Sequence, residues 1–302
     1  MLTSDLCVLW WPSSLAIMTA KEWTGEDASH ALRRPTALDD KYSRGVVGLR
    51  TGSARYPGAA MLGVEAAWRT GTGMVRYLGP ERAQDLVLQR RPETVTADGR
   101  VQAWVIGSGT DAAERDAAET AALRGILNGD LPVVVDAGAL DLVVGAAAPV
   151  VVTPHARELD RLRADLGLSR ADATDDAARE EAALETAAAL GGVVLLKGAV
   201  TIVATGDGWV RRVGAGTPWL ATAGTGDVLA GVLGAVTAGA VAADRRGLDD
   251  LAACAATAAW LHGTAGRVAS GISGGEGGPI TALDVAEALP RVVAGVLSDS
   301  IG

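Results

Sequence analysis

The sequence predicts an α/β fold in which helices cover both faces of a mostly parallel central sheet. Short apolar runs alternate with longer alanine-rich segments along most of the 302 residues. Several of these runs are apolar without interruption, as in PVVVD and GVVLLKG, which is typical of strands buried on both faces of a parallel sheet. Regular alternation of strands and helices favours an open sheet with helices on both sides.

Each element follows from this alternation. The expected strands are residues 46–50, 74–78, 103–106, 132–136, 150–153, 193–196 and 201–204. The expected helices are residues 58–70, 112–127, 157–166, 171–190, 228–240, 251–269 and 282–297. The last two strands and the following run, GWVRRV, lie too close in sequence for helices to fit between them. We therefore expect them to be antiparallel strands at one side of the sheet.

The chain is expected to divide into an N-terminal extension, residues 1–36, that is poorly ordered and one domain, residues 37–302. The apolar stretch LCVLWWPSSLAIM is too short to span a membrane and lacks the basic residues that precede a signal peptide's apolar core. Met18 is an alternative start, and the stretch SGISGGEGGPI is predicted to be a flexible surface loop.

Composition narrows the classes of function. The net charge of −9 argues against nucleic acid as a partner, because such proteins need a basic surface. Cys7 and Cys254 match neither metal-ligand spacing nor a disulfide framework, so a reducing cytoplasm is expected. We expect no membrane association and no transition metal.

Small, polar or glycine-rich turns follow the predicted strands. In open α/β sheets ligands bind beyond the carboxyl ends of the strands, so these turns form the candidate site. The stretch ATAGTGDVLAG places Asp227 at a predicted helix start, after backbone N–H groups that attract anions. From these residues alone, Asp227 is either a helix cap or a base beside a phosphate.

Six motifs carry a resemblance that covers nearly the whole chain from about Lys41 to Val293. They are YPGAAMLGVEAAWRTGTGMV, VIGSGTD, PVVVDAGAL, VVTPHARE, VLLKGAVTIVA and TPWLATAGTGDVLAGVLGAV, followed by AAWLHGTAG. Together, and in this order, they resemble the ADP/ATP-dependent NAD(P)H-hydrate dehydratases of the ribokinase-like superfamily. The resemblance implies a three-layer sandwich. Because little chain precedes Lys41, we expect the form without an epimerase domain.

The resemblance also implies a reaction. Family members repair NADH and NADPH hydrated on the nicotinamide ring, (S)-NADHX and (S)-NADPHX: a nucleotide phosphorylates the ring hydroxyl, phosphate leaves, and the ring double bond returns. ADP is the expected nucleotide for a bacterial member and ATP for a eukaryotic one, and magnesium bound largely through the nucleotide phosphates is the only metal expected. A tetramer is the family's expected assembly. Two alternatives stay open: a small-molecule kinase of the same fold acting on a vitamin precursor or sugar, and a non-catalytic nucleotide-binding protein.

The resemblance assigns roles to residues of this sequence. Asp227 is the implied catalytic base. Substrate contacts are implied for Ala59, Gly109, His155 and Asp227. Nucleotide contacts are implied for Lys197, Gly198, Ala199, Val200, Thr201, Gly224, Thr225 and Gly226. Each has a structural alternative: a helix cap for His155, an ion pair for Lys197, and close packing or a tight turn for the small residues.

Three further residues have separate interpretations. Asp136, at a strand end, is a candidate to act through magnesium or water and ranks below Asp227. Arg50 either reaches a substrate phosphate or is solvated, and the second is favoured. His262 lies in an apolar helix and is interpreted as a packed core residue. The sequence departs from the family patterns TPHPGE and GPGxG, reading TPHARE and GSGTD instead.

Overall fold

The structure is a computed structural model that describes residues 20–171, 175–272 and 277–298. Its strands are β1 (Lys21–Glu22), β2 (Val46–Arg50), β3 (Met74–Tyr77), β4 (Ala103–Ile106), β5 (Val133–Val135), β6 (Val150–Val152), β7 (Val193–Leu196), β8 (Thr201–Ala204) and β9 (Val210–Val213). They form one sheet in the order β1-β9-β8-β7-β6-β5-β4-β2-β3. Pairing is parallel except between β7 and β8 and between β8 and β9, so the predicted antiparallel side is confirmed.

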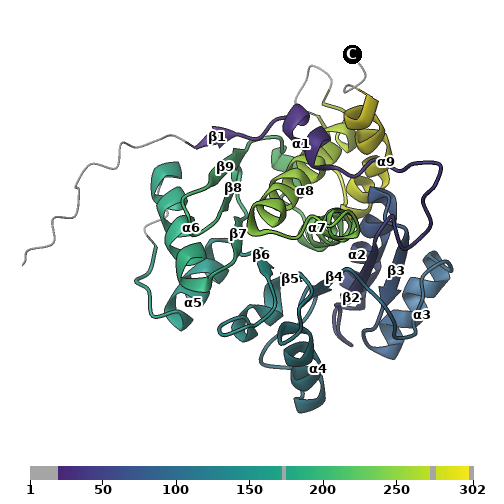
Figure 1. Ribbon diagram of the computed structural model, residues 1–302, viewed down its shortest axis with the longest axis horizontal. Helices are drawn as coiled ribbons and strands as arrows, with labels where there is room; N and C mark the ends of the chain where they lie inside the picture. The colour runs from purple at the N-terminus through teal and green to yellow at the C-terminus, as the bar shows by residue number, and fades with distance from the viewer. Residues whose placement is uncertain (1–19, 172–174, 273–276, 299–302) are drawn as a thin grey trace, which may run out of the picture.

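The α-helices are α1 (Gly25–Ala31), α2 (Pro57–Thr70), α3 (Glu81–Arg90), α4 (Ala117–Leu127), α5 (Ala156–Asp165), α6 (Asp176–Leu190), α7 (Thr225–Ala242), α8 (Leu248–Ala269) and α9 (Ala282–Ser298). Two 3-10 helices, η1 (Ala137–Leu142) and η2 (Pro218–Leu220), follow β5 and β9. Figure 1 shows α4, α5 and α6 on one side of the sheet and α7 and α8 on the other. This three-layer arrangement confirms the predicted fold class.

Alternate strand residues build a separate core on each face of the sheet. Val134 packs with the residues of α1, α2, α7, α8 and α9, whereas Val133 and Val135 pack with those of η1, α4, α5 and α6. Side chains of a strand point alternately to its two faces, so a fully apolar run such as VVV contributes to both cores.

The close approach of α2 to α7 depends on glycine. A Cβ on Gly231 of α7 would lie 2.2 Å from the carbonyl oxygen of Gly63 in α2. Glycine leaves no side chain between the two helix backbones, so α7 packs directly on α2. This contact fixes where the first turn of α7, which carries the GTGD motif, meets the edge of the sheet.

The structure differs from the expected extension over residues 20–36. There β1 pairs with β9, and Thr24 and Asp27 form a reciprocal capping box at the start of α1. Ala28 is fully buried, and α1 packs against α8. These residues are part of the fold because the capping box and one small buried apolar face compensate for the low intrinsic stability of so short a helix. Residues 1–19 lie outside the described residues.

Helix α3 was not expected from the sequence because only Ala83 and Val87 of it are buried. Ion pairs hold it instead. The fully buried carboxylate of Glu65 in α2 accepts hydrogen bonds from Arg91 at the end of α3, and the Arg90 side chain also reaches it. A helix that is held by ion pairs shows no periodic pattern of apolar residues in its sequence, so the pattern could not predict it.

Three expected helices begin elsewhere because of their caps. Asp116 caps α4 and Asp175 caps α6, so both start later than predicted, and Asp250 accepts a hydrogen bond from the backbone N–H of Gly247 at the earlier start of α8. Residues 273–276 of the predicted surface loop SGISGGEGGPI lie outside the described residues.

Among the described residues, α7 is the one helix long and apolar enough by composition to cross a membrane. Within the fold 83% of its candidate span is buried, because α7 packs between the sheet and the other helices of its layer.

Candidate active site at the carboxyl edge of the sheet

Polar side chains gather where β5, β6 and β7 end. Asp136 directly follows β5 and is 3% exposed. One of its carboxylate oxygens accepts a hydrogen bond from Ser108 at 2.9 Å, and the other accepts one from Thr153, directly after β6, at 2.7 Å. Hydrogen bonds from neighbouring strand ends therefore fix this carboxylate in place.

Lys197, directly after β7, links this carboxylate to a second one. Its Nζ donates to Asp136 Oδ1 at 2.9 Å and lies 3.6 Å from Oε2 of Glu158 in α5. Burial lowers the pKa of Lys197, but the negative charges of Asp136, Glu158 and Asp227 outweigh that effect and raise it. Lys197 thus forms the ion pair that was the structural alternative to nucleotide binding. Its side chain nevertheless also lines a cavity, which is described below.

Asp227 is the third residue of α7 and is not its cap. The N-cap is Gly224, whose φ of +90° glycine adopts without strain. Burial and the charge of Asp136 raise the pKa of Asp227 to about 7, while Lys197 opposes the shift. Within the described residues no group donates a hydrogen bond to its side chain. A carboxylate free of partners, with a pKa near neutrality, is equipped to accept a proton.

The carboxylate of Asp136 is not arranged to bind a metal ion. Both of its oxygens are occupied, by Ser108 on one side and by Thr153 and Lys197 on the other. Its geometry suits holding the Lys197 ammonium and placing a negative charge near Asp227. No group of three His, Cys, Asp or Glu side chains in the described part of the chain is arranged to hold a metal ion.

His155 caps α5. Its Nδ1 accepts a hydrogen bond from the backbone N–H of Glu158 at 3.2 Å, and the Glu158 carboxylate accepts one from the His155 N–H at 2.8 Å. The cap alternative is therefore present. The imidazole is nevertheless half exposed, although its Nε2 also lies 3.5 Å from the Glu158 carboxylate. Contact with a substrate stays a prediction that this exposure allows.

Ala59, in the first turn of helix α2, lies against Gly109, in the turn after β4. A Cβ on Gly109, which has φ +66°, would lie 2.2 Å from the Cβ of Ala59. The turn between β2 and α2 is also joined to the turn after β4, by a hydrogen bond of 2.7 Å from Gly52 N–H to the Ser108 carbonyl. Close packing is thus one reason for small residues here, and the predicted substrate contact stays untested.

A cavity of about 500 Å³ opens beside this edge, and we call it the Lys197 cavity. Its lining residues are Lys197, Gly198, Ala199, Thr201, Gly216, Thr217, Pro218, Leu220, Ala221, Thr225, Gly226, Leu229 and His262. Six of the eight residues predicted to bind nucleotide line it, although β7, β8 and α7 bring them from distant parts of the sequence. It has a cationic end at Lys197 and an apolar wall on η2.

The other two predicted nucleotide residues, Val200 and Gly224, do not line the Lys197 cavity. The carbonyl of Val200 accepts a hydrogen bond from Arg179 at 2.9 Å, so it helps to hold the turn between β7 and β8. Thr225 lines the cavity, but its hydroxyl donates to the carbonyls of Leu220 and Thr222. It therefore ties the segment after η2 to the start of α7.

His262 was interpreted from the sequence as a core residue and is also part of the Lys197 cavity. It is 9% exposed, and its Nε2 has no hydrogen-bond partner in the described part of the chain. Burial lowers its pKa to about 4, although the Thr225 backbone raises it slightly. The signal in the sequence was the glycine pair of LHGTAG, which lets α8 approach the cavity wall.

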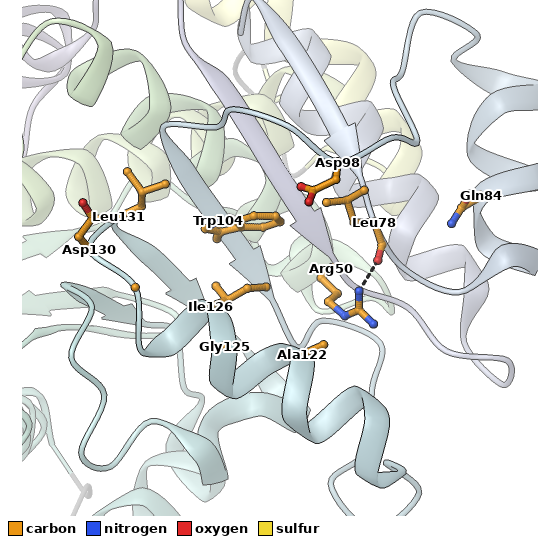
Figure 2. Close-up of a pocket in the computed structure, with 11 residues that line it drawn as sticks. Arg50, Leu78, Gln84, Asp98, Trp104, Ala122, Gly125, Ile126, Asp130 and Leu131 are labelled. Carbon is orange, nitrogen blue, oxygen red and sulfur yellow. Dashed lines mark hydrogen bonds between the residues drawn. The ribbon is translucent and has the colours of Figure 1, made fainter.

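A second cavity of about 500 Å³ lies elsewhere, between α4 and the strands β2 and β4. Figure 2 shows the Trp104 indole in it and the hydrogen bond from the Arg50 guanidinium to the Leu78 carbonyl. The rest of that guanidinium is bound to Glu119. Arg50 is therefore held by protein partners, which argues against the substrate-phosphate alternative and differs from the favoured expectation of a solvated side chain.

The chain is similar to known proteins over most of its length. A family model described as NAD(P)H-hydrate dehydratase matches residues 47–290. This chain belongs to the NAD(P)H-hydrate dehydratase family. The matched residues include the Lys197 cavity and all of the polar edge described above.

Named members of the dehydratase family are similar over much of the chain. A bifunctional NAD(P)H-hydrate repair enzyme of Mycobacterium tuberculosis is 47% identical over 216 residues, which are 68% of this chain and 43% of that enzyme. An ADP-dependent (S)-NAD(P)H-hydrate dehydratase of Xanthomonas campestris is 35% identical over 77% of this chain and 83% of that protein. The chain thus spans less than half the length of the bifunctional relative.

Solved structures place the fold in the same family. The ADP/ATP-dependent NAD(P)H-hydrate dehydratase of Bacillus subtilis, co-crystallised with ATP and Mg²⁺, has a TM-score of 0.78 and 27% identity, covering 92% of this chain and 99% of that one. A hydroxyethylthiazole kinase from Pyrococcus horikoshii, 16% identical with a TM-score of 0.59, shares the fold alone.

Proposed function

We propose that this chain is an ADP-dependent (S)-NAD(P)H-hydrate dehydratase that returns NADHX and NADPHX to NADH and NADPH. The observation that carries the proposal is Asp227 itself. Its carboxylate, with a pKa raised to about 7, lies next to Gly226 at the edge of the Lys197 cavity, where the chain supplies a cation and free backbone N–H groups. Membership of the dehydratase family supports the same reading.

In the proposed first step, Asp227 takes the proton of the ring hydroxyl. The hydroxyl oxygen then attacks the terminal phosphoryl group of ADP, a new P–O bond forms, and the bond to the departing AMP breaks. The negative charge that develops on the phosphoryl oxygens is stabilised by the N–H groups at the start of α7 and by the Lys197 ammonium.

In the second step the C–O bond to the new phosphate breaks, and the ring carbon next to it loses a proton. The electron pair of that C–H bond becomes the ring double bond, and inorganic phosphate leaves. Phosphorylation has replaced hydroxide with a better leaving group. The net change is ADP and hydrated dinucleotide to AMP, phosphate and reduced dinucleotide.

Magnesium fits this site through the nucleotide. Because both oxygens of Asp136 are occupied, the ion would be carried mainly by ADP phosphates, where it would neutralise their charge. The relative from Bacillus subtilis was co-crystallised with ATP and Mg²⁺. Lys197 and the α7 N–H groups would bind the remaining phosphate charge.

We further propose a homotetramer in the cytoplasm, with hydrated dinucleotide and adenine nucleotide as its small-molecule partners and with neither nucleic acid nor membrane. The charge of −9 supports the exclusion of nucleic acid. Sedimentation of the purified chain tests the assembly, and a monomer at micromolar concentration would contradict the tetramer.

The test is recovery of the near-ultraviolet absorbance of NADH when the chain is mixed with purified (S)-NADHX and ADP or ATP. We expect recovery with ADP in strict proportion to AMP formed. Asp227→Asn is expected to lower kcat about 100- to 10,000-fold while leaving ADP binding in place, because it removes the base alone. No recovery with either nucleotide would refute the dehydratase, and full activity of Asp227→Asn would refute the base.

A further inference from the structure

Nε2 of His262 is a buried polar atom without a hydrogen-bond partner in the described part of the chain. Such atoms are rare, because a nitrogen removed from water and left unpaired weakens the folded state. The ring lines the Lys197 cavity, so the missing partner has a place from which to come. No step of the proposed reaction uses this histidine.

The local structure directs His262 to the cavity wall. A Cβ on Gly263 would lie 2.9 Å from the backbone of Ala215 and Gly216, and one on Gly266 would lie 2.7 Å from the Leu220 side chain. These glycines let one face of α8 lie directly on the segment that includes η2. His262 sits on that face, next to Gly216 and Leu220, which also line the cavity.

The charge state of the ring selects the chemistry of its partner. Burial and the charge of Lys197 together lower the pKa of His262 to about 4, against the opposing effect of a hydrogen bond to the Thr225 backbone. The ring is therefore neutral at physiological pH, with one nitrogen as N–H donor and the other as acceptor. Its hydrogen bond to the Thr225 backbone leaves Nε2 as the nitrogen that can bind a ligand. A neutral imidazole suits a hydroxyl or a ring edge, whereas the phosphate charge has Lys197 and the α7 N–H groups nearby.

We propose that His262 hydrogen-bonds the uncharged adenosine part of the nucleotide in the Lys197 cavity and selects for it. This inference rests on the proposed binding of adenine nucleotide there. The apolar wall formed by Pro218, Leu220 and Leu229 offers a surface for an aromatic base, and His262 supplies a directional contact beside it. His262 is a binding residue for the nucleotide and takes no part in the chemical steps.

The test measures ADP binding to His262→Leu by calorimetry. We expect Kd for ADP to rise about tenfold, because the hydrogen bond between the nucleotide and the ring is lost. His30→Gln is the matched control, since His30 is exposed on α1. His262→Asn and His262→Gln, which keep hydrogen-bonding groups, are expected to fall between.

Two nucleotide analogues locate the contact. IDP changes the six-position of the base, and 2′-deoxy-ADP lacks a ribose hydroxyl. A wild-type preference for ADP over IDP that disappears in His262→Leu assigns the contact to the base edge, and a lost preference over 2′-deoxy-ADP assigns it to the ribose. Equal Kd of wild type and His262→Leu for ADP would overturn the inference and indicate a permanently bound water instead.

The wild-type chain gives a readout that needs no variant to fold. It has three histidines, so the imidazole nitrogens can be followed individually by NMR. Saturating ADP is expected to shift the His262 nitrogens while the ring stays neutral and His30 stays unchanged. ADP binding without a shift at His262 overturns this inference alone, whereas failure of the wild type to bind ADP overturns the proposed function.

Discussion

Lys197 and Asp136 follow β7 and β5, two strands separated by β6, and their side chains meet at 2.9 Å. This pair joins the two halves of the candidate site. Asp136 is fixed by Ser108 and Thr153, and Lys197 reaches from it toward Glu158 and the start of α7. Several electrostatic consequences can be measured.

The pKa of Asp227 predicts opposite pH effects on stability and activity. Because that pKa is raised from 3.8 to about 7, the folded state binds this proton more tightly than the unfolded state. The stabilisation is complete below pH 3.8 and disappears as pH rises through 7. Asp227→Asn should therefore melt a few degrees higher than the wild type at pH 8 and equally at pH 4.

Activity should rise over the same range, because the base must be ionised to accept a proton. The kcat of the wild type is expected to increase with pH through about 7. Asp130→Asn, which alters an exposed carboxylate before β5, is the control and should leave both profiles unchanged. A wild-type profile that is flat from pH 5 to 8 would contradict the assignment.

Asp136→Asn should move the pH profile and weaken the fold together. Removing the Asp136 charge lowers the pKa of Asp227, so the rise in kcat should occur at lower pH. Lys197 also loses its nearest carboxylate, and the free energy of unfolding should fall by about 3 kcal/mol, as when a buried pair is broken. Denaturant titration and rate profiles measure the two effects.

Ser108→Ala is the matched control for Asp136→Asn. It removes one hydrogen bond to Asp136 and leaves the charge in place, so the free energy of unfolding should fall by about 1 kcal/mol with no displacement of the profile. If the two variants displaced the pH profile of kcat equally, the charge of Asp136 would not be what raises the pKa of Asp227.

Gly109→Ala should lower both the stability and the affinity for hydrated dinucleotide. Its Cβ would lie 2.2 Å from that of Ala59, at a φ of +66°, so the two turns must separate. The expected loss is about 2 kcal/mol. Adding Ala59→Gly should restore part of it, because the opposing Cβ is then absent.

Gly125→Ala provides the comparison for Gly109→Ala. Gly125 lies within α4, and a Cβ there meets nothing within 4 Å. Alanine at this position should stabilise the chain by about 0.5–1 kcal/mol and leave substrate affinity unchanged. Equal stability of wild type and Gly109→Ala would show that the turns after β2 and β4 are not closely packed.

Glu65→Gln should detach α3 from α2. Its arginine partners hold the pKa of Glu65 at about 2 against the opposing effect of burial, so its stabilisation is present above pH 4.5 and is lost as pH falls toward 2. The variant should lose about 3 kcal/mol at pH 7. Glu119→Gln breaks the more exposed pair with Arg50 and should lose at most about 1 kcal/mol.

Much of the fold followed from local patterns. Uninterrupted apolar runs such as 133–135 belong to strands that are buried on both faces, and closely spaced runs at 193–213 had to pair antiparallel. Helix α3 and the short β1 did not follow, because the ion pairs of Glu65 and the pairing of β1 with β9 involve residues far away in sequence.

The motifs by themselves determined which residues to examine: Asp227 after GTG, Lys197 before GAVT, and His155 in TPHARE. The tertiary structure decided how they are used. It placed Gly224 rather than Asp227 at the helix cap, occupied both oxygens of Asp136, and put His262 in the wall of the Lys197 cavity. Burial, pKa and free hydrogen-bonding capacity depend on neighbours that the folded chain brings together from distant strands, and no local stretch of sequence contains them.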